Sequence, residues 1–140
     1  MPTIVSYQKY IEQLITRSLH LPSDADHHPL GIELATLTSG LTYVSIDDGA
    51  SLPSEQPAEI ASSISNPANL SLEILTELRL ASPQVRFING RVADAIAERY
   101  TTADEIKLLR TAPSTEFNTY NAFVEDCRAW GRAEKAKLGL

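Results

Sequence analysis

Residues 32–49, IELATLTSGLTYVSIDDG, contain the clearest β-strand signal in the chain. Apolar residues alternate with small or polar ones on both sides of Ser39-Gly40, which is typical of two strands joined by a tight turn. The pattern predicts a β-hairpin of residues 32–38 and 41–46, closed by Asp47-Asp48-Gly49. Because two strands alone are marginally stable in water, the apolar face of this hairpin needs another element to cover it.

The segment before the hairpin is the first candidate for that cover. Apolar and small residues recur at helical spacing from Ile4 to Ser18, and Thr3 is available as an N-cap. The spacing predicts an amphipathic helix over residues 4–19. Residues 21–31, LPSDADHHPLG, carry the proline, aspartate and glycine that are typical of a loop.

The chain after the hairpin changes from loop to helix. Residues 49–69 are rich in serine and proline, and they predict a long loop with at most one short turn at PAEIASSI. Start signals for four helices then follow: Ser71, with Leu70 and Leu75 as a hydrophobic staple; Ser82-Pro83; a capping box of Thr102 and Glu105; and Ser114. Four helices joined by short turns predict a small helical bundle.

The predicted fold class is therefore α+β, with an N-terminal helix and β-hairpin followed by a C-terminal helical bundle of about four helices. A length of 140 residues fits one domain. We expect a single domain over residues 1–140, with the helix and hairpin in 1–48, the serine- and proline-rich loop in 49–69 and the helical part in 70–140.

The composition is that of an ordinary soluble globular protein, with 43% apolar and 21% charged residues. No apolar run is long enough to span a membrane. The start MPTIVSYQKY lacks the basic and apolar regions of a secretory signal, so a cytoplasmic location is expected. One cysteine cannot form an internal disulfide, and stability must come from packing.

The net charge of −6 is concentrated in the first half of the chain. Residues 1–70 carry eight acidic and two basic residues, whereas residues 71–140 carry ten of each. An acidic surface repels phosphate backbones, which argues against binding of nucleic acid by the N-terminal half. The charge pattern favours a basic or neutral protein partner.

Two sets of residues offer reactive groups, and a structural role explains each of them better. His20, His27 and His28 lie in or near an acidic loop, but they lack the ligand spacing of a metal site. Cys127 lies on an apolar helical stripe, where cysteine is usually a buried hydrophobic residue. We therefore predict no enzyme, catalytic residue, metal or cofactor. The alternative is a small metal-dependent enzyme that uses the His20/His27/His28 loop.

The final helix, over residues 114–137, carries a wide apolar face. The neighbouring helix DEIKLLR is only about two turns long and is too short to cover that face. We expect Phe123 and Trp130 to be substantially buried, either within the domain or in a self-association interface. The predicted interaction residues are Phe117, Tyr120, Phe123 and Trp130, and a homodimer at micromolar concentration is the simplest form of assembly.

The C-terminal sequence resembles that of small proteins encoded in bacteriophage and prophage tail regions. The resemblance rests on DEIKLLR, on the pattern EFxxYxxFVExCRAWG and on the closing KAKLGL, and extends more weakly to GLTYVSIDDGASLPSEQP and SPQVRFINGRV. It carries no catalytic residue onto this chain. It implies a tail accessory component or a chaperone-like assembly factor, located in the cytoplasm of a bacterial host or in the virion, with a phage tail component as partner.

Overall fold

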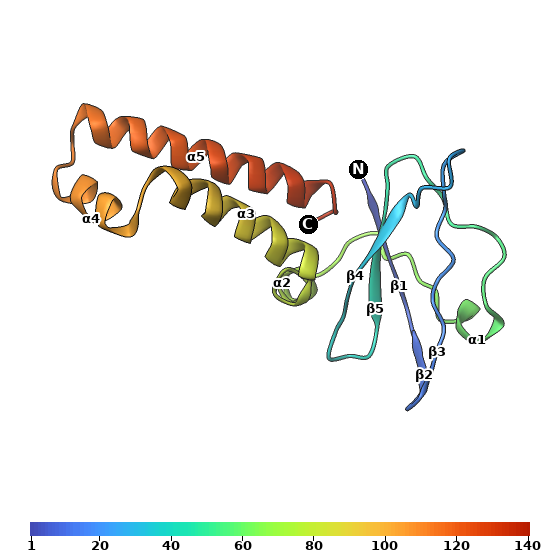
Figure 1. Ribbon diagram of the computed structural model, residues 1–140. Helices are drawn as coiled ribbons and strands as arrows, with labels where there is room; N and C mark the ends of the chain where they lie inside the picture. Colours follow the sequence, from blue (N-terminus) through green and yellow to red (C-terminus); the bar gives the residue numbers. More distant parts are fainter. The chain divides into compact units, whose positions relative to one another are not determined.

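The computed structural model describes residues 1–140 and divides into two compact units. The first comprises Met1–Gln84 and Lys137–Leu140, and we call it the β unit; the second comprises Val85–Ala136, and we call it the helical unit. The chain therefore leaves the β unit once and returns to it for its last four residues (Figure 1). Strands in the N-terminal region and helices in the C-terminal region confirm the α+β class.

Five strands form two antiparallel sheets in the β unit. The strands are β1 (Thr3–Tyr7), β2 (Tyr10–Glu12), β3 (Ile15–Thr16), β4 (Gly31–Thr36) and β5 (Thr42–Ile46). Three of them make a sheet in the order β1-β5-β4, and β2 pairs with β3 alone. The β4–β5 pair confirms the predicted hairpin, with Thr36 opposite Thr42 beside the turn. Gly40 in that turn has a φ of 88°, a conformation that glycine adopts without steric cost.

The predicted helix over residues 4–19 is wrong, because this segment forms β1, β2 and β3 instead. Val5 and Tyr7 face one cluster of buried residues, and Ile4 faces another. This alternation is the period of two that a strand imposes on a sheet packed on both faces. Leu14, which lies within the predicted helix, is 97% exposed.

Each face of the three-stranded sheet has its own core cluster. On one face the buried residues are Val5, Tyr7, Leu19, Val44, Ile46 and Ile60. On the other they are Ile4, Leu34, Leu37, Tyr43 and Leu78. The loop of residues 49–69 contributes to the first cluster through α1 (Ala58–Ala61), which holds Ile60 fully buried. That short helix occupies the position of the one predicted turn.

The end of the chain covers part of the second cluster. Leu138 and Leu140 pack against it, and the Arg79 guanidinium donates to the Leu140 carbonyl oxygen at 2.8 Å. Gly139, with a φ of 82°, allows the chain to turn there, and the position of its missing Cβ lies 3.1 Å from Ile4. The last residues are therefore part of the packing of the β unit.

Four further helices follow α1: α2 (Leu72–Ala81), α3 (Pro83–Arg99), α4 (Thr102–Arg110) and α5 (Thr115–Ala136). The Ser71 hydroxyl accepts from the Ile74 amide and the Ser114 hydroxyl from the Phe117 amide, which confirms both predicted caps. The capping box lies one residue earlier than predicted, since it joins Thr101 to Asp104. The predicted pair of Thr102 and Glu105 lies inside α4.

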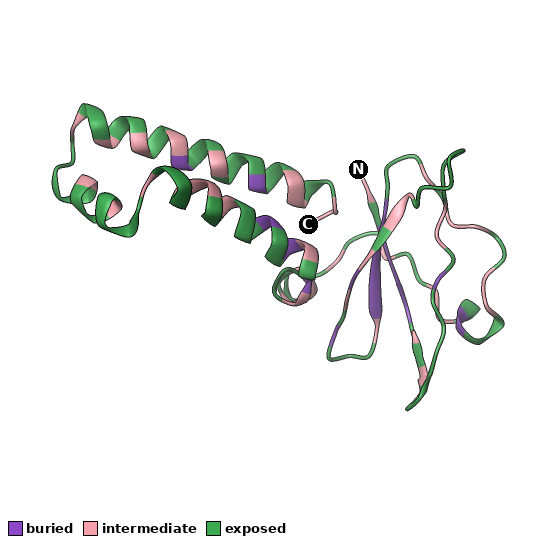
Figure 2. Ribbon diagram, in the orientation of Figure 1, coloured by how far each residue is buried: buried purple, intermediate pink, exposed green.

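Gly131 sets the spacing of α3 and α5 in the helical unit. A Cβ at this position would lie 2.8 Å from Cγ2 of Val92, closer than two carbon atoms pack. The only buried residues of the unit are Val85, Ile88, Val124 and Gly131, and both core clusters lie in the β unit (Figure 2). No helix in the chain has the length and apolar character needed to cross a membrane.

Candidate interaction surface

Three of the four predicted interaction residues form an aromatic cluster inside the helical unit. Phe117, Tyr120 and Phe123 of α5 are half-buried. The ring of Tyr100 packs edge-on against Tyr120, with centroids 4.9 Å apart, and at a tilt against Phe123, at 5.8 Å. The Arg99 guanidinium lies 4.6 Å from the centroid of the Phe123 ring. Aromatic and cation–π contacts of this kind stabilise helix packing, so a large part of these three side chains is already in contact within the chain.

The hydroxyl of Tyr120 also connects α5 to α4. It donates to Oε1 of Glu105 at 3.0 Å. Partial burial, and then the carboxylate of Glu105, raise the pKa of Tyr120 above its ordinary value of 10.0. The phenol therefore keeps its proton, and with it this hydrogen bond, throughout the neutral pH range.

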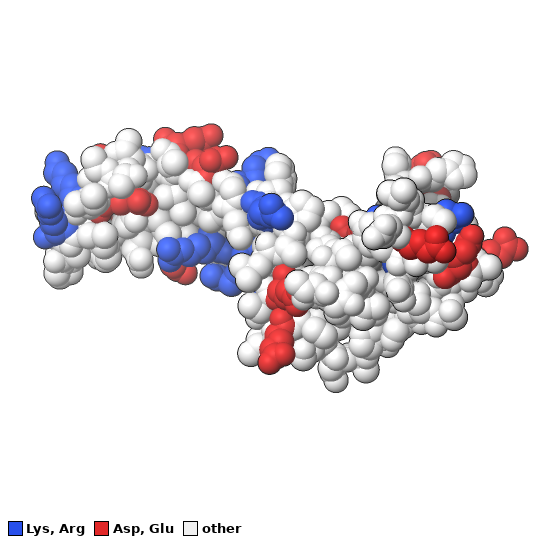
Figure 3. All heavy atoms as spheres, turned by 90° about the horizontal axis from the view of Figure 1, so that it is seen from below, with Lys and Arg blue, Asp and Glu red and all other residues white.

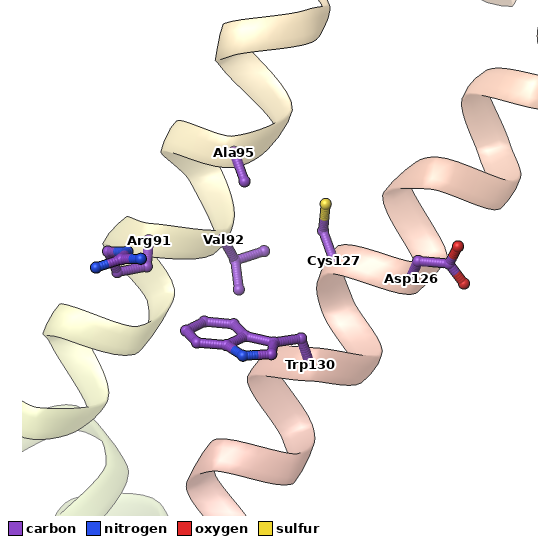
Figure 4. Close-up of a pocket in the computed structure, with 6 residues that line it drawn as sticks. All are labelled: Arg91, Val92, Ala95, Asp126, Cys127 and Trp130. Carbon is purple, nitrogen blue, oxygen red and sulfur yellow. The ribbon is translucent and has the colours of Figure 1, made fainter.

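Trp130, the fourth predicted interaction residue, lies outside the aromatic cluster and is 43% exposed. It lines a groove of about 320 Å³ between α3 and α5, together with Arg91, Val92, Ala95, Asp126 and Cys127. Figure 4 shows the indole lying across the groove toward α3, with Cys127 also pointing toward α3. The floor of the groove is therefore apolar.

The rims of the groove carry one charge of each sign. Arg91 on α3 and Asp126 on α5 project away from each other on opposite sides (Figure 4). Neither forms an ion pair within the chain. The Arg91 guanidinium lies 5.9 Å from the ring centroid of Phe87, which is 65% exposed. Apolar side chains thus continue along the α3 rim beyond the groove.

Sequence reasoning identified Trp130 but did not identify the α3 side of the groove. That side consists of Arg91, Val92 and Ala95, and Phe87 precedes them on the same helix. The spacing of Phe87 and Arg91, four residues apart on one helix, is the local signal that an aromatic and a cation share a face. Only the pairing of α3 with α5 shows that Arg91 and Ala95 line one groove with Trp130.

The three histidines do not come together. His20 is near the loop of residues 49–69, where its Nδ1 lies 3.2 Å from the Glu55 carbonyl oxygen. His28 lies 3.3 Å from Asp24, and these two residues with Asp26 form the only group whose ligand atoms are close enough to share a metal ion. All three members are exposed, and neither His20 nor His27 belongs to the group. Cys127 lies in the apolar groove, half-buried.

The charges divide cleanly between the two units. The β unit carries ten acidic and four basic residues, a net charge of −6, whereas the helical unit carries eight of each and is neutral. In the view of Figure 3, acidic side chains outnumber basic ones over the β unit, while both signs occur over the helical unit. The field of the β unit therefore attracts cationic partners, and that of the helical unit favours neither sign.

Comparisons with protein-family models, with curated proteins and with solved structures found no match to this chain. The resemblance to phage-tail proteins stays a prediction from the sequence. What the protein does has to follow from its own surfaces, of which the groove and the acidic β unit are the two most distinctive.

Proposed function

We propose that the protein is a non-enzymatic interaction and assembly protein. The helical unit supplies the surface for assembly, and the acidic β unit binds a basic protein partner. One observation carries the proposal: the helical unit has no core cluster of its own and leaves large apolar side chains in contact with water.

The helical unit leaves four large apolar side chains partly in water. Phe87, Ile106, Leu109 and Trp130 are each between 43% and 65% exposed within a unit of 52 residues. Burial of apolar surface stabilises an association by about 25 cal/mol per Å² of area removed from water. Trp130 and the apolar groove that it lines are the part of this surface best suited to a protein–protein contact.

The resemblance of the C-terminal sequence supports a place for this function in phage or prophage tails. A tail accessory component or a chaperone-like factor needs binding surfaces and no active site. On this proposal the protein acts in the cytoplasm of a bacterial host or within the virion, and its partner is a tail component. The net charge of −6 on the β unit supports a partner with a basic surface.

Co-expression with bacteriophage tail proteins tests the proposal. The full chain, carrying a tag, is purified with each tail protein in turn, and complexes are detected by size-exclusion chromatography at low and high salt. We expect one tail component to co-elute at low salt and to dissociate as salt screens the acidic surface. If none co-elutes at any salt concentration, the tail assignment is wrong.

Matched charge variants show which unit binds that component. Asp47→Lys with Asp48→Lys changes the β unit, and Asp94→Lys with Glu98→Lys changes the helical unit by the same amount of charge. We expect the first pair to weaken the complex and the second to leave it nearly unchanged. The reverse order would place the partner on the helical unit.

A further inference from the structure

We infer that the groove between α3 and α5 is covered by the same groove of a second copy, so that two helical units form a four-helix dimer. The inference rests on the proposed function, and it names the partner of the helical unit. Three features of the groove support a second copy: its apolar floor, the charge balance of the unit that carries it, and the placement of its two rim charges.

The apolar floor provides the driving force for association. Trp130 exposes 43% of its surface, and Phe87 on the adjacent rim exposes 65%. Tryptophan and phenylalanine are among the side chains that most often anchor protein interfaces. When two copies meet groove to groove, each indole covers the floor of the other copy, and both rings leave water together.

The charge balance favours a second copy over a partner of strong net charge. The helical unit is neutral, with eight acidic and eight basic residues, so two helical units approach without net repulsion. Two β units, each with a net charge of −6, repel each other. Self-association of this chain is therefore expected through its helical unit and not through its sheets.

The rim charges determine how the two copies are oriented. Arg91 and Asp126 lie on opposite sides of the groove, and neither forms an ion pair in its own chain. A two-fold axis parallel to the helices places Arg91 of each copy beside Asp126 of the other. A two-fold axis across the helices places like charges together. Charge complementarity therefore selects the parallel axis, with α3 of one copy packed on α5 of the other.

Charge reversal provides a test that leaves the core of each copy unchanged. Arg91→Glu gives a dimer in which both rim contacts are acid against acid, and Asp126→Lys gives one in which both are base against base. In an equal mixture of the two variants, every rim contact of the mixed dimer again joins opposite charges. The masses of the parent chain, the two variants and their mixture are measured by sedimentation equilibrium across the micromolar range.

The parent chain is expected to show twice the 15.3 kDa of one copy. Each variant alone should raise the dissociation constant by about tenfold or more, since two attractive rim pairs become repulsive. The mixture should regain the affinity of the parent. Far-UV circular dichroism of the separate variants should match that of the parent, because both side chains are exposed.

Three results would overturn the inference. They are a parent chain that is monomeric throughout the range, variants that dimerise as well as the parent, and a mixture that stays as weak as the separate variants. A monomeric chain that still binds a tail component refutes the dimer and leaves the proposed function standing. A dimer that binds no tail component refutes the tail partner and leaves the dimer standing, so the two failures are distinguishable.

Discussion

Replacing Gly131 with alanine should destabilise the helical unit, although alanine is the better helix former. The added Cβ would lie 2.8 Å from Cγ2 of Val92 and 3.8 Å from Cγ2 of Ile88. Carbon atoms pack at about 3.5–4.0 Å, so α3 and α5 have to separate or Val92 has to move. Valine in a helix has one strongly preferred rotamer, and it therefore yields little. Overpacking of this kind costs about 1–3 kcal/mol.

Gly90→Ala is the matched control in the same unit. Gly90 lies within α3, and a Cβ added there would meet nothing within 4 Å. The substitution should stabilise the unit by about 1 kcal/mol, the difference in helix propensity between glycine and alanine. Gly131→Ala gains the same stabilisation from helix propensity. The difference between the two variants therefore isolates the contact with Val92.

Urea unfolding of both variants measures this difference. Unfolding is monitored by circular dichroism and by the fluorescence of Trp130, at a protein concentration low enough to avoid association. A third variant, Val92→Ala combined with Gly131→Ala, removes the methyl group that the new Cβ would meet. The loss in free energy of unfolding of this double variant should be smaller than the sum of the losses of Val92→Ala and Gly131→Ala, as measured in a double-mutant cycle. If Gly131→Ala stabilises as much as Gly90→Ala does, the close approach of α3 and α5 is refuted.

Three further predictions concern other parts of the chain. Glu77 accepts from the Thr38 hydroxyl at 2.8 Å and from the Thr38 amide at 3.1 Å, and these bonds lower the pKa of Glu77 below its ordinary value of 4.5. The ionised carboxylate therefore stabilises the fold above pH 4.5, and this stabilisation is lost as pH falls through the lowered pKa. Thermal melts should show less acid destabilisation for Glu77→Gln than for the parent. Trp130→Ala should cost the monomer about 1–2 kcal/mol in urea unfolding, below the 3–5 kcal/mol of a fully buried tryptophan, and a full-sized loss at low concentration would contradict the observed exposure. His27→Ala with His28→Ala should leave the melting temperature nearly unchanged with or without added zinc, whereas a zinc-induced rise in the parent alone would reveal a metal site.

The parts of the fold that local signals determine could be predicted from the sequence. The hairpin around Ser39-Gly40 follows from alternation and from a turn that requires a positive φ. The caps at Ser71 and Ser114 follow from side chains that bond to amides three residues later. These features depend on neighbours in the chain and need no knowledge of the tertiary structure.

The N-terminal region could not be predicted in the same way, because its apolar residues fit two periods. Ile4, Tyr7 and Ile11 are three or four residues apart, as on a helix. Ile4 and Val5 are also β-branched, and a hairpin of β4 and β5 alone would leave one edge of β5 free for a further strand. The pairing of β1 with β5 decides between the two periods, and that pairing joins residues about forty positions apart.

The candidate site shows the same limit. The sequence pattern predicts that Phe117, Tyr120, Phe123 and Trp130 lie on one helix and form one interaction surface. In the structure these residues separate: Tyr100, which follows α3, packs against Tyr120 and Phe123, while the close approach of α3 and α5 at Gly131 leaves Trp130 beside a groove. A helical wheel of α5 shows which side chains share a face, but the facing helix decides which of them remain available to a partner.

The path of the chain links the stability of the two units. The last residues close the second core cluster of the β unit, where Leu138 and Leu140 pack beside Leu78 and Arg79 holds the Leu140 carbonyl. They reach that position only through α5, which belongs to the helical unit. Unfolding of α5 therefore lengthens the loop that returns Leu138 to the sheet, and the cost of closing a loop rises with its length. Any partner that orders the helical unit reduces that cost, so binding at the groove should also protect the β unit.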